Sequence, residues 1–134
     1  MSKQLHVRTG VVAGATGLLG LFALTAATDS PLGQTSGGLW EVTGARNSGP
    51  VRQCVANTRA LAQFEHRGEN CLPTLVRESG DTAVFQYNCP SGGFGQSEVQ
   101  VLTPRSLRIA TQGISKGLPF SYVVQARRIG ACAH

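Results

Sequence analysis

The sequence predicts a mainly β protein: an antiparallel, curved, meander-like sheet with one short helix, stabilised by two disulfides. Three observations support this fold class. From Gly38 onward, short runs of alternating apolar and polar residues are separated by Gly, Pro, Ser and Asn, a pattern typical of strands and turns. Only residues 57–68 carry apolar side chains at helical spacing. All four cysteines follow an apolar N-terminal run that has the form of an export signal.

The apolar run at residues 11–24 contains Gly14, Gly17 and Gly20 at a spacing that also occurs in dinucleotide-binding loops. Such a loop binds its cofactor where a strand leads into a helix, with an acidic residue about 20 positions further on, at the end of a second strand. Residues 28–38 occupy that place and consist of turn and linker residues. The glycine spacing therefore predicts no nucleotide cofactor.

The same run fits a cleaved signal peptide. Lys3 and Arg8 form a positively charged start, the apolar run follows, and small residues precede Thr28. The run is shorter than a membrane span of about 20 residues, so no stable transmembrane segment is expected after cleavage. The predicted compartment is the periplasm or the cell exterior. The predicted parts are a signal peptide at residues 1–27, a flexible linker at 28–37 and a single disulfide-stabilised β domain at 38–132.

The first two strands are expected at residues 38–44 and 51–55. In the first, alternation places Trp40 and Val42 on one face. Gly, Pro, Ser and Asn between the two runs predict a turn, so the two strands form a hairpin.

The helix is expected at residues 57–68. Asn57 can cap its first turn, Leu61 and Phe64 follow at helical spacing, and Gly68 can end it. One apolar side of this helix would then pack on the sheet.

Residues 72–89 are expected to form a second hairpin that turns at Ser79 and Gly80. This register brings the apolar positions of the two strands to the same face. In the same register, Cys71 points to the outer face of the sheet and Cys89 to the inner face. The predicted cross-strand pairs are Val76 with Ala83, Thr74 with Phe85, and Leu72 with Tyr87.

The rest of the chain predicts a loop and three further strands. Residues 90–95 form the loop, and residues 96–103 and 106–112 form a hairpin around Pro104 and Arg105. The last strand is long and spans residues 118–129. Its expected inward face consists of Leu118, Phe120, Tyr122, Val124 and Ala126.

The cysteines are Cys54, Cys71, Cys89 and Cys132. An even number behind an export signal predicts two disulfides, and no closely spaced pair of the zinc-binding kind is present. Because Cys71 and Cys89 are expected on opposite faces, a bond between them is not predicted. Either Cys54 pairs with Cys71 and Cys89 with Cys132, or Cys54 pairs with Cys89 and Cys71 with Cys132. We favour the first arrangement, because a bond between Cys54 and Cys71 would hold the intervening helix on the sheet.

Four short features resemble a known family: GLWEVT at residues 38–43, QC at 53–54, the cysteines around the second hairpin, and ARRIGAC at 126–132. They resemble the domain-of-unknown-function 3617 family, small exported proteins of Gram-negative bacteria. Two features depart from the family pattern, which often has an acidic residue where this chain has Ala131 and is often rich in methionine, whereas this chain has only Met1. The resemblance implies export and this fold. It brings no catalytic residues, because the family has no assigned activity.

Few residues suggest chemistry, and no catalytic, metal or cofactor site is predicted. Glu65, His66 and Glu69 lie together at the end of the expected helix, where a histidine is favoured by the helix dipole, and no metal-ligand spacing recurs. The net charge is +5, but the arginines are scattered and lack interleaved aromatic residues, so nucleic acid is not an expected partner. Catalysis is therefore not the expected activity.

We expect a periplasmic or envelope-associated binding or structural domain. Aromatic residues on the inward faces of several strands predict a small apolar pocket for a hydrophobic ligand or envelope component. One alternative is a small secreted hydrolase that uses His66, and another is an inhibitor that presents residues 90–96 to a partner enzyme. The candidate binding residues are Trp40, Phe85, Tyr87, Phe94, Phe120 and Tyr122.

Overall fold

The computed structural model describes Gly10 and residues 30–133 of the chain. The predicted signal peptide, apart from Gly10, lies outside the described residues. In the described part of the chain, no helix has both the length and the apolar character that crossing a membrane requires.

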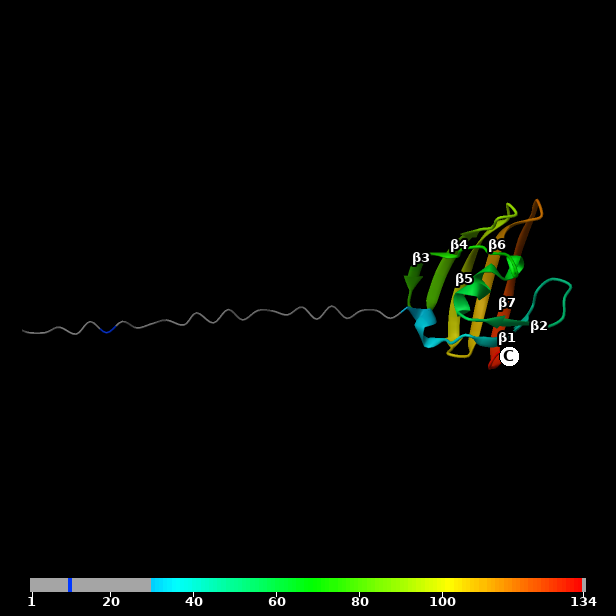
Figure 1. Cartoon of the computed structure of the whole chain (residues 1–134). Coiled ribbons are helices and arrows are strands. Elements are labelled where there is room, and N and C mark those ends of the chain that lie inside the picture. The colour runs from blue at the N-terminus through cyan, green and yellow to red at the C-terminus, as the bar shows by residue number, and fades with distance from the viewer. Residues whose placement is uncertain (1–9, 11–29, 134) are drawn as a thin grey trace, which may run out of the picture.

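Within the described residues, seven antiparallel strands form one open sheet, in the spatial order β2-β1-β7-β6-β5-β4-β3 (Figure 1). Strands β3 to β7 follow one another as a meander, and the hairpin of β1 and β2 is added beside β7. The strand bounds are β1 Gly38–Thr43, β2 Val51–Val55, β3 Thr74–Ser79, β4 Thr82–Asn88, β5 Phe94–Thr103, β6 Ser106–Ser115 and β7 Leu118–Gly130. The predicted fold class is confirmed.

The two faces of the sheet differ. One face, the core face, is covered by the helix η2 (Thr58–His66), which lies against it as a green coil in Figure 1 and contacts β5, β6 and β2. The other, which we call the open face, carries the alternate, mostly exposed positions of the same strands. The fully buried side chains on the core side include Trp40, Val42, Leu61, Phe64, Phe85, Val99, Leu107, Ile109 and Val124.

Helix η2 forms where the sequence predicts a helix, as a 3-10 helix. The Asn57 side chain accepts a hydrogen bond from the Arg59 backbone N–H at 2.8 Å, so the predicted cap is present. Beyond the end of the helix, Gly68 has a φ of +87°, a conformation that glycine adopts without strain. Leu61 and Phe64, the predicted apolar positions of the helix, are buried as expected.

A second 3-10 helix, η1 (Pro31–Gln34), lies inside the segment predicted to be a flexible linker. Pro31 and Leu32 are buried in it, and Leu32 joins the hydrophobic core. The Thr35 hydroxyl donates to the Leu32 carbonyl and lies 2.7 Å from the Thr58 hydroxyl. These contacts make residues 31–35 part of the folded domain.

The β3–β4 hairpin has a different register from the predicted one. Ser79 pairs with Thr82, so the turn consists of Gly80 and Asp81. Gly80 has a φ of +59°, and glycine is favoured at this first turn position in hairpins of type II′. An irregularity next to Val76 then shifts the pairing again. Leu75 pairs with Phe85 and Thr74 with Gln86.

This shift corrects the predicted inward faces. On β4, Ala83, Phe85 and Tyr87 are buried as expected. Leu72 precedes β3 and is 78% exposed, and Val76 in the irregular region is 52% exposed. At the start of β7, Leu118 is also exposed, in contrast to the predicted inward position.

The cysteines pair differently from the favoured arrangement. The structure contains Cys54–Cys132 and Cys71–Cys89, and no cysteine is free. Pairing of Cys54 with Cys71 and of Cys89 with Cys132 is therefore wrong. The reason is that Cys71 lies before β3 and does not follow the alternation of that strand. Its side chain turns inward and meets Cys89, and both are buried.

Candidate ligand-binding groove

A groove of about 620 Å³ crosses the open face near the ends of β4, β5, β6 and β7. Most of its lining residues occupy the exposed, alternate positions of these strands. Among the described residues that line it, none carries a charge at neutral pH. The lining consists of Gln86, Tyr87, Asn88, Phe94, Gly95, Gln96, Gln112, Gly113, Ile114, Pro119, Phe120 and Ser121.

Four polar side chains form a row across the groove, which we call the amide row: Gln86, Gln96, Gln112 and Ser121. Strand register places them side by side, because Gln86 pairs with Gln96, Gln96 with Gln112, and Gln112 with Ser121. The Gln86 side-chain amide donates to the Gln96 side-chain oxygen at 2.9 Å. The row therefore offers both donors and acceptors on adjacent strands.

An apolar row lies one pleat away, towards the end of the sheet. Phe94 pairs with Ile114, and Ile114 pairs with Pro119. Phe94 was predicted in a loop but is the first residue of β5, and 48% of its surface is exposed. The groove thus has an aromatic side chain beside hydrogen-bonding amides, the combination found in many small-ligand sites.

Two glycines let the opposite face support this region. A Cβ on Gly95 would lie 2.5 Å from Tyr87 Oη, and one on Gly113 would lie 2.1 Å from the Phe94 carbonyl oxygen. Because Gly95 has no side chain, Tyr87 can lie directly against β5 on the core face, and because Gly113 has none, β6 can lie close to the β5 backbone. The strands under the groove are therefore held in place by close packing.

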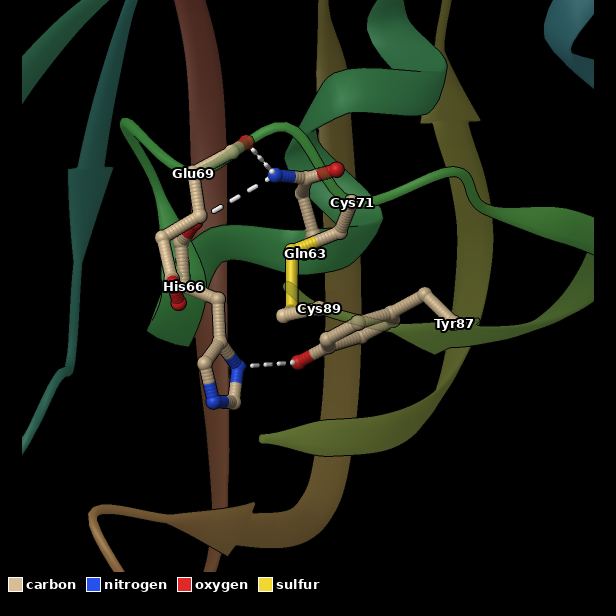
Figure 2. Close-up of a disulfide and its surroundings, with 6 residues drawn as sticks. All are labelled: Gln63, His66, Glu69, Cys71, Tyr87 and Cys89. Atoms are coloured by element: carbon tan, nitrogen blue, oxygen red, sulfur yellow. Dashed lines mark hydrogen bonds between the residues drawn. A yellow bond between two sulfur atoms is a disulfide. The ribbon is translucent and has the colours of Figure 1, made fainter. Parts of the chain in front are cut away.

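His66 lies at the centre of this support. Its ring makes edge contacts with Tyr87 and Phe120, at centroid distances of 5.4 and 5.8 Å. Its Nδ1 lies 3.1 Å from Tyr87 Oη. Figure 2 shows this contact next to the Cys71–Cys89 disulfide. His66 is buried, and its Nε2 packs against Gly93. A Cβ on Gly93 would lie only 2.2 Å from this nitrogen atom.

Burial determines the ionisation of both tyrosines near the site. Desolvation raises the pKa of Tyr87 to about 12, so its hydroxyl stays neutral. Burial also raises the pKa of Tyr122, together with the hydrogen bond that its hydroxyl donates to the Glu65 carboxylate at 2.6 Å. Both hydroxyls therefore act as hydrogen-bonding groups and not as bases.

The comparison with protein families agrees with this architecture. Residues 34–132 match the model for a protein of unknown function, DUF3617, a range that contains all seven strands, the groove and both disulfides. The chain belongs to the DUF3617 family. The resemblance found from its short motifs is thereby confirmed. Neither a curated protein nor a solved structure gives a significant match.

In this DUF3617 domain, one group of side chains has the geometry of metal ligands. One ligand atom each from His66, Glu69 and Cys89 lie within 4.8 Å of one another. The sulfur of Cys89 is bonded to Cys71, so it offers no thiolate to a metal. The Gln63 side chain donates to the Glu69 carbonyl at 2.9 Å, which ties this segment to η2. The group is therefore built into the fold around a disulfide.

The hydrolase interpretation depends on His66, and its surroundings do not resemble those of a catalytic base. Ser91 and His66 both line a second hollow of about 760 Å³. Among the hydrogen bonds of the described residues, none joins these two side chains, and the imidazole bonds to Tyr87 instead. Ser91 is exposed in the turn between β4 and β5. In this arrangement, His66 Nδ1 is therefore engaged with Tyr87 and not with Ser91.

The predicted binding residues fall into two groups. Tyr87, Phe94 and Phe120 line the groove. Trp40 and Phe85 are fully buried in the core and contribute to the packing. Tyr122 is half-buried, is bonded to Glu65 and borders a smaller hollow next to the groove. The amide row was missed, because the sequence shows only single polar residues at outward positions of separate strands. Knowledge of the strand register is needed to bring them together.

Proposed function

We propose that this DUF3617 protein is an exported binding domain of the bacterial envelope, whose groove holds a small ligand with an apolar part. The observation that carries the proposal is the groove itself, which combines a half-exposed Phe94 with uncharged polar side chains. Soluble domains keep single apolar side chains exposed at little cost, but a concave site with converging polar groups is typical of ligand binding. Glycines and the His66 contacts hold the groove in shape without a ligand.

Export is supported by two independent features. The N-terminal residues have the composition of a signal peptide, and the domain has two disulfides, which persist in oxidising compartments. The test is the intact mass of the protein from a periplasmic fraction, before and after reduction with alkylation. A mass that begins near Thr28, with four cysteines alkylated only after reduction, is expected. A full-length mass with free thiols would contradict export.

Groove binding is tested with a neutral fluorescent naphthylamine probe, whose emission rises when it enters an apolar site. The probe should bind the purified protein, and Phe94→Ala should weaken binding about tenfold, because the aromatic wall of the groove is lost. Leu102→Ala is the matched control: Leu102 lies on the same strand, is also 48% exposed, and does not line the groove. Equal effects of the two substitutions would mean that the probe binds elsewhere.

A further inference from the structure

The amide row has a property that a purely apolar ligand does not use. Gln86, Gln96 and Gln112 present carboxamides on three adjacent strands, with Ser121 on the fourth. Each carboxamide can donate and accept hydrogen bonds at the same time. An acyl chain laid across this row would displace water from these groups without replacing its hydrogen bonds, which is unfavourable.

We propose that the groove binds a neutral glycan, with sugar hydroxyls on the amide row and the apolar side of a sugar ring against Phe94. This inference rests on the proposed function, since it names the ligand class of the same groove. Hydroxyl groups are donors and acceptors, as the carboxamides are, so each can bond to either atom of a glutamine side chain. Phe94 supplies the apolar surface that the C–H groups of a sugar ring require.

The lack of positive charge along the described lining of the groove disfavours acidic ligands. None of the described lining residues is charged at neutral pH, and Tyr87 stays protonated because of its raised pKa. Next to the amide row, Glu98 borders a smaller hollow of about 260 Å³ and adds a negative charge. A phosphate, carboxylate or uronic acid would find no cation here to bond with. An uncharged ligand is complementary to this surface.

The extent of the site favours a chain of at least two sugars. The smaller hollow shares Gln96, Gln112 and Ser121 with the groove and continues over Ala110 and Val123. The amide row is thus bordered by a hollow on each side, along the direction of the strands. Positions two residues apart on a strand are about 7 Å apart, a distance that leaves room for separate rings on either side of the row.

The inference is tested by titrating the full disulfide-bonded protein with neutral gluco- and chito-oligosaccharides, followed by calorimetry and amide NMR. Binding of a neutral oligosaccharide is expected. The double substitution Gln96→Ala/Gln112→Ala should weaken it about tenfold, which corresponds to the loss of about one net hydrogen bond. Gln125→Ala is the matched control, because Gln125 is an exposed glutamine of β7 outside the groove. Each variant should keep the thermal unfolding midpoint of the parent protein.

The outcomes separate this inference from the proposed function. Binding of the naphthylamine probe that depends on Phe94, without binding of any oligosaccharide, would overturn the glycan assignment and leave the groove as a hydrophobic site. If neither the naphthylamine probe nor any oligosaccharide binds, both the glycan assignment and the proposed groove function are overturned. Sugar binding that is unchanged in the Gln96/Gln112 variant, or tighter binding of a uronic acid oligomer, would also overturn the assignment. Loss of sugar binding in that variant, with probe binding retained, would support it.

Discussion

Removal of the Cys54–Cys132 disulfide should be the most destabilising change that leaves the core packing intact. This bond joins residues separated by 78 positions and connects β2 to the segment after β7. For a loop of that length, chain entropy gives a stabilisation of about 4.5 kcal/mol. Cys54 is exposed and Cys132 is half-buried, so Cys54→Ala/Cys132→Ala leaves no buried cavity. The loss should therefore come from the cross-link.

The assay is urea unfolding of the parent protein and of Cys54→Ala/Cys132→Ala under non-reducing conditions, monitored by circular dichroism. Domains of this size have unfolding free energies of about 5–15 kcal/mol, so a loss of about 4.5 kcal/mol is readily measured. Cys71→Ala/Cys89→Ala is the comparison, because that loop spans 18 positions and gives about 3 kcal/mol, plus a packing term for two buried sulfurs. A loss below about 1 kcal/mol for Cys54→Ala/Cys132→Ala would refute the entropic reasoning. A proteolytic peptide linking Cys54 to Cys71 would refute the pairing itself.

Three further predictions concern stability. The free energy of unfolding should fall as pH rises from about 10 to 12, because Tyr87 ionises near 10 in the unfolded chain but only near 12 when folded. Urea titrations at a series of pH values measure this fall, and Tyr87→Phe should make the dependence on pH less steep. Ser97→Ala should cost about 1–3 kcal/mol in urea unfolding, because the buried Ala62 carbonyl loses its donor; an unchanged midpoint would show that water replaces it. Gly95→Ala should cost about 1–3 kcal/mol, since the new Cβ would lie 2.5 Å from Tyr87 Oη, whereas Gly49→Ala, with nothing within 4 Å, should leave the melting temperature within a degree or two.

Much of the strand structure could be predicted from local alternation. Trp40 and Val42 share a buried face, and β2 has the predicted bounds, because each depends only on neighbours in sequence. The turn at Gly80 and Asp81 could not be distinguished from one at Ser79 and Gly80, since both are compatible with a hairpin. The turn alone moves each partner by two residues and keeps the faces; the irregularity next to Val76 is what changes the inward side of β3. The expected disulfides were wrong because Cys71 lies before β3 and outside its alternation.

The candidate site depended on contacts that are distant in the chain. Phe94 was a candidate because an aromatic residue between glycines stands out in the sequence. Gln96 and Gln112 did not stand out, since an outward glutamine on a strand is common. Only the pairing of β5 with β6 shows that these residues are neighbours. His66 was found as a polar helix end, and its burial against Tyr87 follows from the packing of η2 on the sheet.

The position of β7 in the sheet sets a requirement on how the protein folds. Among the described residues, the last strand in sequence, β7, is the one that pairs with both β1 and β6. The β1–β2 hairpin, although made first, has no partner in the sheet until residues 118–130 are available. Such pairing between distant segments slows folding. The sheet is therefore complete only once β7 has paired with both of its neighbours, β1 from the start of the domain and β6 from its end.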